Sequence, residues 1–366
     1  MKIILRNLLF ITNVIIGLLL IIATVSVYVN PNTFLYIALL GMAFPIFLII
    51  IISLLIYWIF RKKYKFVLFN IVMLILTFPF ITDFIQLNNN TNNTNNTIKI
   101  MSFNVRQFDY YNWKNNIKLR DKYFKYIKAE NPDIICFQEF FSSKSDSLEN
   151  IKLLISEIFN TGNYHFFPTH KLYKDKLYGI ATFSKYPIIN KSEITFPGSS
   201  NLCIYTDILI KNDTVRIYNN HLQSIKFQPK DYQFMDSLKL EIDKEKVGEA
   251  KGIIKRLLTG FEIRANQVDV ISNNIKNCKY KTIVCGDFND TPISYTYHKM
   301  KDKLNDSFIE AGTGIGNTYN GPFPSFRIDY ILYSSDFECI KYLSPHINLS
   351  DHFPVISYLK IKDTNN

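Results

Sequence analysis

The sequence predicts an α/β domain that follows three membrane-spanning helices. Three observations support this fold class. The first 87 of the 366 residues are almost continuously apolar, whereas apolar strands and amphipathic segments alternate from about residue 98 onward. Several of these apolar strands end in short polar motifs. The mixture suits packed sheets with helices beside them and functional side chains at the strand ends.

The membrane anchor is predicted to occupy residues 1–87. Its spans are Leu8–Val29 and Phe34–Phe60, which contain no charge, and Phe66–Leu87, which contains only Asp83. About 20 apolar residues cross a bilayer, so each segment is long enough. We expect Asp83 at the outer interface rather than as a buried functional charge.

The rival interpretation of the first segment is a cleaved signal peptide, because Lys2 and Arg6 precede it. It is disfavoured because the apolar stretch is long, lacks a small-x-small cleavage site and precedes two further spans. Lys2, Arg6 and the basic loop 61–65 should face the cytoplasm, since cytoplasmic loops are enriched in Lys and Arg. Three crossings then place the domain in the periplasm or outside the cell.

A linker and a large domain follow the anchor. Asn88–Thr97 is rich in Asn and Thr and should form a short flexible tether, and residues 98–366 form the domain. The net charge is +11; six Lys and Arg against one acidic residue in 1–97 account for +5, which leaves +6 on the domain. This excess attracts polyanions such as nucleic acid or anionic lipid without choosing between them.

Helical spacing appears in three segments of the domain, and a charged insert precedes the last. The predicted helices are Trp113–Glu130, Leu148–Phe159 and Arg264–Lys276, and further strands are Gly179–Phe183, Leu202–Ile210 and Val215–Asn219. Asp231–Gly260 is predicted to be a solvated helical hairpin, with a lid over the site as the alternative.

Six polar motifs follow in order along the domain. They are Ser102–Arg106 (SFNVR), Cys136–Glu139 (CFQE), Asn220–Leu222 (NHL), Gly286–Asn289 (GDFN), Arg327–Tyr330 (RIDY) and Ser350–Val355 (SDHFPV). Over about residues 98–360 this ordered set resembles the endonuclease/exonuclease/phosphatase superfamily, also called DNase I-like. The resemblance implies a four-layer α/β sandwich that hydrolyses a phosphoester with a divalent metal.

Glu139 is the main candidate metal ligand. It follows a predominantly apolar strand, where a buried carboxylate is costly unless a cation neutralises it. Oxygen ligands of this kind suit Mg²⁺, with Mn²⁺ as the alternative. The resemblance adds Asp351 near the metal, and Asn104 as a ligand or a donor to the phosphate.

Two histidines are expected at the phosphate. Adjacent side chains in an extended segment point in opposite directions, so only a turn brings Asp351 and His352 to one site. The resemblance implies that arrangement and sets His352 against the scissile phosphate. We expect Asp329 to fix the tautomer of His352 and raise its pKa. His221 is expected as leaving-group acid or oxyanion stabiliser.

Asp287 and Asn289 flank Phe288 and should both face the cleft while Phe288 packs behind. Asp287 is the candidate for orienting or deprotonating water, and Asn289 for donating to a phosphate oxygen. Arg106 stands where some superfamily members carry an Asp. A cation there favours a phosphate contact and one catalytic metal over two.

The predicted function is therefore a membrane-anchored, metal-dependent phosphodiesterase that acts as a nuclease. The alternative is a phospholipase C-like (sphingomyelinase-type) phosphodiesterase or a phosphatase acting on lipid or inositol phosphates, suggested by the spans and the short tether. A non-catalytic membrane receptor on the same fold is the least favoured. The expected partners are a phosphoester substrate and the lipid bilayer; the sequence identifies no protein partner.

Overall fold

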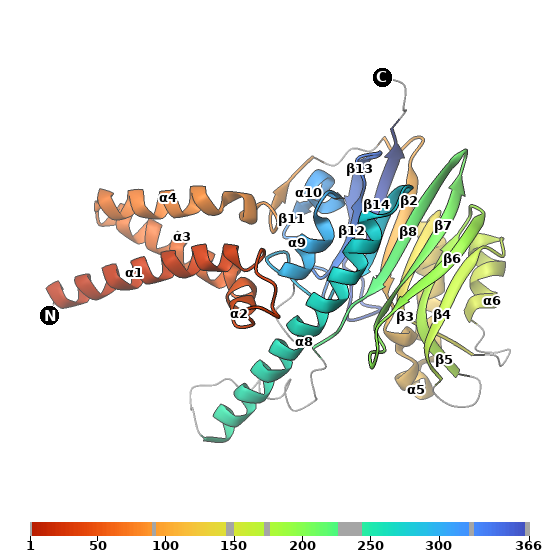
Figure 1. The fold of residues 1–366 in the computed structure, drawn as a ribbon, viewed down its shortest axis with the longest axis horizontal. Helices are drawn as coiled ribbons and strands as arrows, with labels where there is room; N and C mark the ends of the chain where they lie inside the picture. Colours follow the sequence, from red (N-terminus) through yellow and green to blue (C-terminus); the bar gives the residue numbers. More distant parts are fainter. Residues whose placement is uncertain are drawn as a thin grey trace. The chain divides into compact units, whose positions relative to one another are not determined.

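The computed structural model describes residues 2–89, 93–143, 150–171, 176–225, 244–321 and 326–362 (Figure 1). The chain divides into two compact units. The helical unit comprises Met1–Ile85, Ile225–Val268 and Asp290–Met300, and the sandwich unit comprises Gln86–Ser224, Asp269–Asn289 and Lys301–Asn366.

Two six-stranded sheets form the sandwich unit. The first has the order β13-β14-β2-β3-β5-β4 and the second β10-β12-β9-β8-β7-β6. The first sheet consists of β2 (Ile98–Asn104), β3 (Ile134–Ser143), β4 (Tyr164–Lys171), β5 (Lys176–Ser184), β13 (Phe337–Leu343) and β14 (Val355–Ile361). The second consists of β6 (Ile188–Thr195), β7 (Leu202–Ile210), β8 (Asp213–His221), β9 (Lys281–Asp287), β10 (Asn305–Asp306) and β12 (Asp329–Tyr333).

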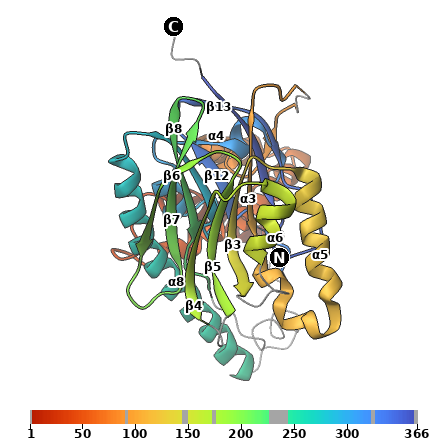
Figure 2. The same cartoon turned by 90° about the vertical axis from the view of Figure 1, so that its right-hand side faces the viewer.

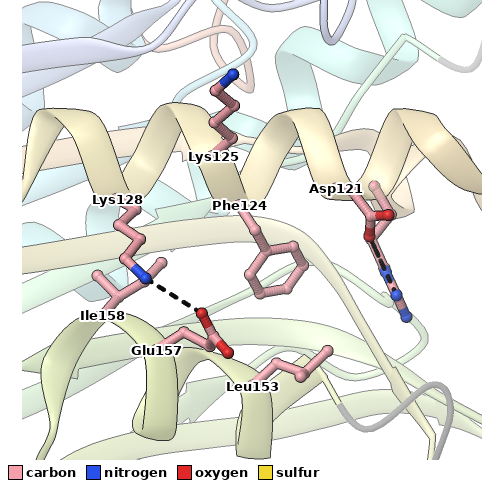
Figure 3. A pocket seen from close by; sticks show the side chains of 8 residues that line it. Asp121, Phe124, Lys125, Lys128, Leu153, Glu157 and Ile158 are labelled. Atoms are coloured by element: carbon pink, nitrogen blue, oxygen red, sulfur yellow. Dashed lines mark hydrogen bonds and ion pairs between the residues drawn. The ribbon is translucent and has the colours of Figure 1, made fainter.

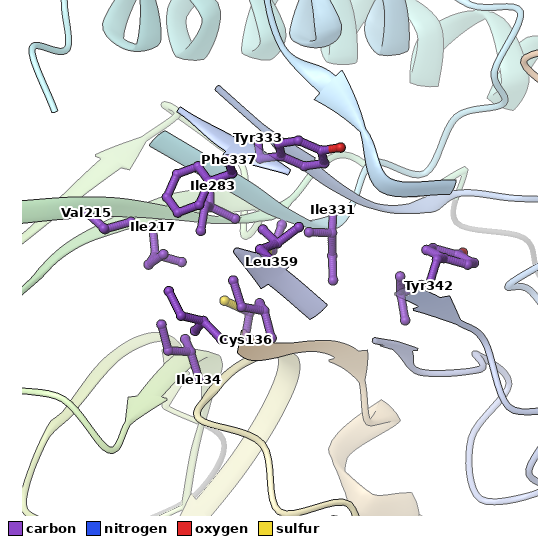
Figure 4. Close-up of a cluster of buried hydrophobic side chains, with 14 of the residues drawn as sticks. Ile134, Cys136, Val215, Ile217, Ile283, Ile331, Tyr333, Phe337, Tyr342 and Leu359 are labelled. Atoms are coloured by element: carbon purple, nitrogen blue, oxygen red, sulfur yellow. The ribbon is translucent and has the colours of Figure 1, made fainter. Parts of the chain in front are cut away.

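Alternating side chains give the first sheet two buried faces. Ile100 and Ile134 pack against residues of the second sheet such as Ile217 and Ile283, and together they form the core between the sheets (Figure 4). Their sequence neighbours Met101 and Ile135 point the other way, towards Tyr123 of α5 (Trp113–Glu130). Since both faces are covered, apolar residues can follow one another without alternation, as in Ile134–Phe137 of β3.

Helices cover the outer faces of the sheets. α5, α6 (Asn150–Leu154) and the π-helical turn η3 (Ile155–Phe159) lie along the first sheet (Figure 2). On the second sheet, Tyr218 Oη donates to Asn274 Oδ1 of α8 (Lys244–Lys276) at 2.7 Å. The predicted α/β sandwich is therefore confirmed.

The remaining short elements are η1 (Arg106–Asn112), α9 (Tyr295–Lys301), α10 (Ser307–Ala311) and the ladder β1 (Gln86–Leu87) with β11 (Thr313–Gly314). The predicted helix 113–130 has the bounds expected of it, whereas the predicted helix 264–276 is the second part of the longer α8. Of the predicted insert 231–260, residues 231–243 lie outside the described part of the chain, and residues 244–260 belong to α8.

The helical unit corrects the prediction of three spans. Its helices are α1 (Lys2–Val25), α2 (Ile37–Met42), α3 (Phe44–Phe60) and α4 (Tyr64–Ile81). Two stretches, Asn7–Val25 and Tyr64–Ile81, are long and apolar enough to cross a membrane. Only 28 % and 11 % of these two windows are buried, so their side chains are mostly exposed, unlike those of a core helix.

The predicted second span, 34–60, is wrong as a single helix. Ala43 separates α2 from α3, and Pro45 lies in the first turn of α3. Proline has no N–H to donate and its ring clashes with the carbonyl four residues earlier, so the helix restarts there. The 17 residues of α3 measure about 26 Å at 1.5 Å per residue, which is shorter than a hydrocarbon core of about 30 Å. The predicted third span also ends early, at Ile81 rather than Leu87.

Buried polar contacts join the helices of this unit. Asn13 Oδ1 accepts from Trp58 Nε1 and from Asn70 Nδ2, each at 3.0 Å, which connects α1, α3 and α4. Asp83 is also buried rather than exposed at an interface, and His298 Nε2 lies 3.2 Å from its Oδ2. Ile293 packs into the apolar cluster that contains Leu20 and Phe44. Residues 290–300 are thus an integral part of the helical unit.

Candidate active site

Strand ends bring the candidate residues of the sandwich unit together. β2 and β3 are parallel, as are β8 and β9, so within each pair the carboxyl ends meet at one edge. His221 ends β8 directly opposite Asp287, which ends β9. β12 runs antiparallel to β9, so its first residue, Asp329, also lies opposite Asp287. Asn104 ends β2 and donates from Nδ2 to Asp287 Oδ2 at 3.0 Å, which links the two sheets at this edge.

His352 and Asp329 form a buried pair. His352 Nδ1 lies 2.9 Å from Asp329 Oδ2, so the other ring nitrogen, Nε2, is directed elsewhere and lies 3.8 Å from Asp287 Oδ2. Burial lowers the pKa of His352, but the carboxylates of Asp329 and Asp287 outweigh it and raise that pKa to about 10. The imidazole therefore carries a positive charge at neutral pH.

Asp287 accepts hydrogen bonds from both sheets. Asn289 N donates to its Oδ1 at 2.8 Å, while Asn104 Nδ2 and Asn289 Nδ2 donate to its Oδ2 at 3.0 and 3.1 Å. Burial raises the pKa of Asp287, and the histidines on either side oppose that rise. Asn289 Nδ2 also donates to Leu222 O at 3.0 Å, so the expected donation to a phosphate would replace one of these bonds.

His221 faces two carboxylates at longer range. Its Nε2 lies 3.8 Å from Asp287 Oδ2 and 3.9 Å from Glu139 Oε1. Burial lowers the pKa of His221, although Asp287 opposes the effect. The two imidazoles of the site therefore differ in charge at neutral pH: His352 is cationic and His221 is neutral.

Glu139 lies at a bulge in β3. The pairing with β5 shifts between Phe137 and Phe140, and Glu139 has a φ of 51°, which turns its side chain out of the alternating pattern. Its pKa is raised to about 7, first by burial and then by Asp351 and Asp287, with His352 opposing. Among the described residues, only His221 lies within ion-pair distance of this carboxylate, at 3.9 Å.

A turn brings Asp351 to the site beside His352. Ser350 Oγ donates to Asn104 O at 2.8 Å, which holds this turn against the end of β2. Arg106 Nε lies 3.7 Å from Asp351 Oδ2, and the Arg106 side chain is 57 % exposed. The backbone N–H of Arg106 donates to Asn104 Oδ1 at 3.1 Å. The expected turn at Asp351 and His352 is present, and the exposed guanidinium of Arg106 lies beside it.

The carboxylates in this site suit a divalent cation. Asp287, Asp329 and His352 offer ligand atoms within 4.8 Å of one another. Those atoms already bond to each other or to amide donors, however, whereas Glu139 accepts no such donor among the described side chains. Crowding by neighbouring carboxylates also opposes ionisation of Glu139, and a nearby cation would relieve it. The donor set therefore fits a hard cation at Glu139 and Asp351 better than at the His352 pair.

Thr318 and Tyr319 support the site but belong to none of the sequence motifs. Thr318 Oγ1 accepts from Asp329 N at 3.1 Å and from Ile328 N at 3.0 Å. Tyr319 forms a β-bridge with His352, and its ring meets the imidazole edge-on with centroids 5.4 Å apart. A threonine and a tyrosine without a neighbouring motif carry no chemical signal, so sequence reasoning missed both.

A separate surface groove lies between α5 and the segment formed by α6 and η3, with a volume of about 340 Å³. Lys128 bonds to Glu157 across it, above an apolar floor that includes Phe124 and Leu153 (Figure 3). None of the candidate site residues lines this groove, and it takes no part in the chemistry considered below.

Comparison with known families adds two matches. The profile of the Endonuclease/Exonuclease/phosphatase family matches residues 101–352, so the resemblance seen in the motifs is confirmed. A domain family of unknown function matches residues 6–84. No curated protein matches the chain.

Solved structures share the fold. A protein described as endonuclease/exonuclease/phosphatase from Beutenbergia cavernae has a TM-score of 0.53 at 14 % identity, over 73 % of this chain and 72 % of that one. The human Nocturnin catalytic domain with bound sulfate anion has 0.51 at 17 %, over 75 % and 96 %. A family protein from Bacteroides thetaiotaomicron has 0.51 at 16 %, over 73 % and 98 %. At these identities the likeness shows the DNase I-like fold alone.

Proposed function

The chain belongs to the endonuclease/exonuclease/phosphatase family, and we propose that it is a membrane-anchored phosphodiesterase that requires Mg²⁺, or alternatively Mn²⁺, and cleaves nucleic acid. The observation that carries this proposal is the His352–Asp329 pair at 2.9 Å, next to Asp287 and at the same edge as Glu139. Members of this family are typically metal-dependent phosphoester hydrolases. A charged imidazole can stabilise negative charge on a phosphate, and crowded carboxylates can hold a divalent cation.

Glu139 and Asp351 would hold the metal, with Asn104 Oδ1 as the third candidate ligand. Bound there, the cation would neutralise the carboxylates and polarise the phosphoryl oxygen. We propose one metal rather than two, because the Arg106 guanidinium 3.7 Å from Asp351 disfavours a second cation nearby.

The protein's own groups have distinct roles in the proposed reaction. Asp287 orients or deprotonates the attacking water, since its carboxylate is fixed by Asn104 and Asn289. His352 donates a hydrogen bond from Nε2 to a phosphate oxygen, and Asp329 holds the imidazole in that orientation. His221, neutral at pH 7, stabilises the phosphate with a ring N–H; in its alternative role as leaving-group acid it would first have to take up a proton.

Nucleic acid is our first choice of substrate because of the basic rim. Arg106 is exposed beside the site, and the domain carries a net charge of about +6, which attracts polyanions. Phosphodiesters of lipids are the second candidate. The exposed apolar residues of α1 and α4 support it, because a bilayer around these helices would keep the chain among phospholipids.

The test uses the full chain reconstituted in lipid nanodiscs with Mg²⁺. Plasmid DNA, RNA, sphingomyelin and inositol phosphates are assayed in parallel, with His352→Ala as the inactive variant and the exposed His346→Ala as its matched control. Cleavage of DNA or RNA that is lost in His352→Ala and kept in His346→Ala supports the nuclease proposal. Hydrolysis of lipid alone would replace it with the second candidate. Turnover that persists in His352→Ala would refute the proposed site.

A further inference from the structure

One cavity of the helical unit has the chemistry of an anion site. It has a volume of about 780 Å³ and is lined by Asn7 and Phe10 of α1 and by the segment Lys62–Phe66, which comprises the end of the turn between α3 and α4 and the first residues of α4. Three of the lining residues are lysines, at positions 62, 63 and 65. The hydrolytic site described above uses none of these residues.

Among the described residues of segment 2–85, the positive charge at this cavity has no counter-ion. The sequence contains no Asp or Glu before Asp83, and Arg61 adds a fourth cation beside the three lysines. All four side chains are exposed, and within residues 2–85, as far as these are described, none of them forms an ion pair. Like charges within four residues repel one another, so an anion that enters the cavity lowers their mutual repulsion.

The backbone of the turn concentrates this charge. Lys62 has a φ of 53°, and Lys62 N and Lys63 N donate back to Ile59 O and Trp58 O at 2.9 and 3.1 Å. The chain therefore reverses tightly between α3 and α4, which holds Lys62, Lys63 and Lys65 on one short segment. A bound phosphate would meet several ammonium groups at once.

The cavity also has an apolar floor. The rings of Phe10 and Phe66 lie with centroids 4.8 Å apart, and those of Trp58 and Phe66 lie 4.4 Å apart. Leu8 and Leu68, on the same two helices, are 57 % and 63 % exposed. Apolar surface thus continues from the floor onto the helices, where acyl chains would run. A free phosphate ion would use the lysines but not this surface.

We propose that the cavity binds the phosphate-bearing headgroup of an anionic phospholipid. The ammonium groups of Lys62, Lys63 and Lys65 contact the phosphate, the aromatic floor contacts the glycerol carbons, and the acyl chains follow α1 and α4. A basic pocket between membrane helices is a recurring means of lipid recognition. The proposal depends on insertion of these helices in a bilayer, and not on hydrolytic activity.

The experiment measures the melting temperature of the full chain in a neutral detergent with added phosphatidylglycerol, phosphatidylcholine or inorganic phosphate. We expect stabilisation by phosphatidylglycerol at concentrations where phosphatidylcholine and inorganic phosphate have little effect. The triple variant Lys62→Gln, Lys63→Gln, Lys65→Gln should bind phosphatidylglycerol about 100-fold more weakly, since each lysine contributes about a factor of five.

Two comparisons keep the test decisive. The control variant changes the exposed Lys122, Lys125 and Lys251 to Gln, and it should keep the wild-type response. The lipid-free melting temperature of each variant shows whether it is folded; if the triple variant does not fold, Lys63→Gln alone is measured and should weaken binding about fivefold. Equal stabilisation by phosphatidylglycerol and phosphatidylcholine, or an unchanged response in the lysine variants, would overturn the proposal. Stabilisation by inorganic phosphate at the same concentrations would replace the lipid with a free anion.

Discussion

Asp329 determines how His352 presents its second ring nitrogen to the substrate. Replacing Asp329 with Asn removes the negative charge that helps to keep the imidazole of His352 protonated. It also replaces a carboxylate, which only accepts hydrogen bonds, with an amide that can donate as well. We expect kcat to fall by about 10²- to 10⁴-fold with a smaller change in KM, because the pair acts on charge that develops during the reaction. Steady-state kinetics of Asp329→Asn, with the half-exposed Asp302→Asn as control, measures this. A loss confined to KM would contradict the assigned role.

Glu139 should couple metal binding to stability. Because burial and neighbouring carboxylates oppose its ionisation, a bound cation should stabilise the folded chain, by about 2.7 kcal/mol at a hundred times the dissociation constant. Thermal unfolding with and without Mg²⁺ tests this in wild type, in Glu139→Gln and in the surface control Glu157→Gln. Only Glu139→Gln should lose the increase in melting temperature that Mg²⁺ produces. A full Mg²⁺ response in that variant would place the metal elsewhere.

His165 should make stability depend on pH away from the active site. It is buried beside Thr206 Oγ1, 2.9 Å from its Nδ1, and burial lowers its pKa to about 4. The unfolded chain takes up this proton below about 6.5 but the folded chain does not, so stability should fall as the pH drops from 6.5 to 4, by up to about 3 kcal/mol. Melting temperatures at pH 7 and 4.5 should show a smaller decrease in His165→Gln than in wild type or in His346→Gln. Equal decreases in the melting temperatures of all three proteins would show that His165 is not the source of the pH dependence.

The site residues were predictable to the extent that each belongs to a motif with its own chemistry. Asp329 and His352 are 23 positions apart, yet their pairing follows from the order of the motifs and is observed at 2.9 Å. The donation of Asn289 to a phosphate stays a prediction, whereas the bonds of its amide to Asp287 and Leu222 were not predicted. Hydrogen bonds to nearby carbonyl groups depend on loop geometry, and sequence spacing does not specify that geometry.

Among the strands, the end of β9 depends on a residue without a side chain. Gly286 has a φ of 136°, and a Cβ at this position would lie 2.0 Å from Asn220 O on β8. Gly286→Ala should therefore destabilise the fold by at least about 2 kcal/mol and reduce activity by displacing Asp287. Thermal unfolding compares it with Gly162→Ala, where a Cβ meets nothing within 4 Å and the change should stay within about 0.5 kcal/mol. Equal melting temperatures for the two variants would contradict this close approach.

Element boundaries were harder to predict than element types. The apolar residues between 34 and 60 contain no charge, so hydropathy treats them as one span, although Pro45 divides them. In the same way, Gln86 and Leu87 extend the third apolar run but pair with Gly314 and Thr313 as a strand. Hydropathy reports how readily a segment leaves water, and backbone hydrogen bonding decides where a helix begins and ends.

Across the whole molecule, the basic residues lead to a proposed orientation. With the two candidate spans α1 and α4, the hydrolytic residues would lie on the same side of the bilayer as Lys2 and Arg6, whereas a third crossing by the shorter α3 would put them on the opposite side. Fusions at the carboxyl terminus of the full-length chain, made in a Gram-negative host, measure the number of crossings. Two crossings predict a fluorescent fusion with green fluorescent protein and an inactive fusion with alkaline phosphatase. An active alkaline phosphatase fusion would mean an odd number of crossings.

The fold class was predictable for the whole molecule because the apolar strands and polar motifs recur in an order that few folds share. The composition of the helical unit was not predictable. Arg264 Nε lies 3.1 Å from Asp290 Oδ2, and Ile293 packs with Leu20, although these residues are far apart in the chain. Such long-range contacts leave no periodic signal, so the sequence alone assigned residues 290–300 to the domain 98–366.

The membership of residues 290–300 in the helical unit has a practical consequence for producing the protein. A shortened chain that begins at residue 98 would keep Ile293 and the α8 residues Ile253, Leu257 and Phe261 but would lose the apolar side chains they pack against. Bare apolar surface of this kind promotes aggregation. Purification should therefore retain the first 85 residues and the detergent or lipid they require, and a truncated sample that precipitates would say nothing about catalysis.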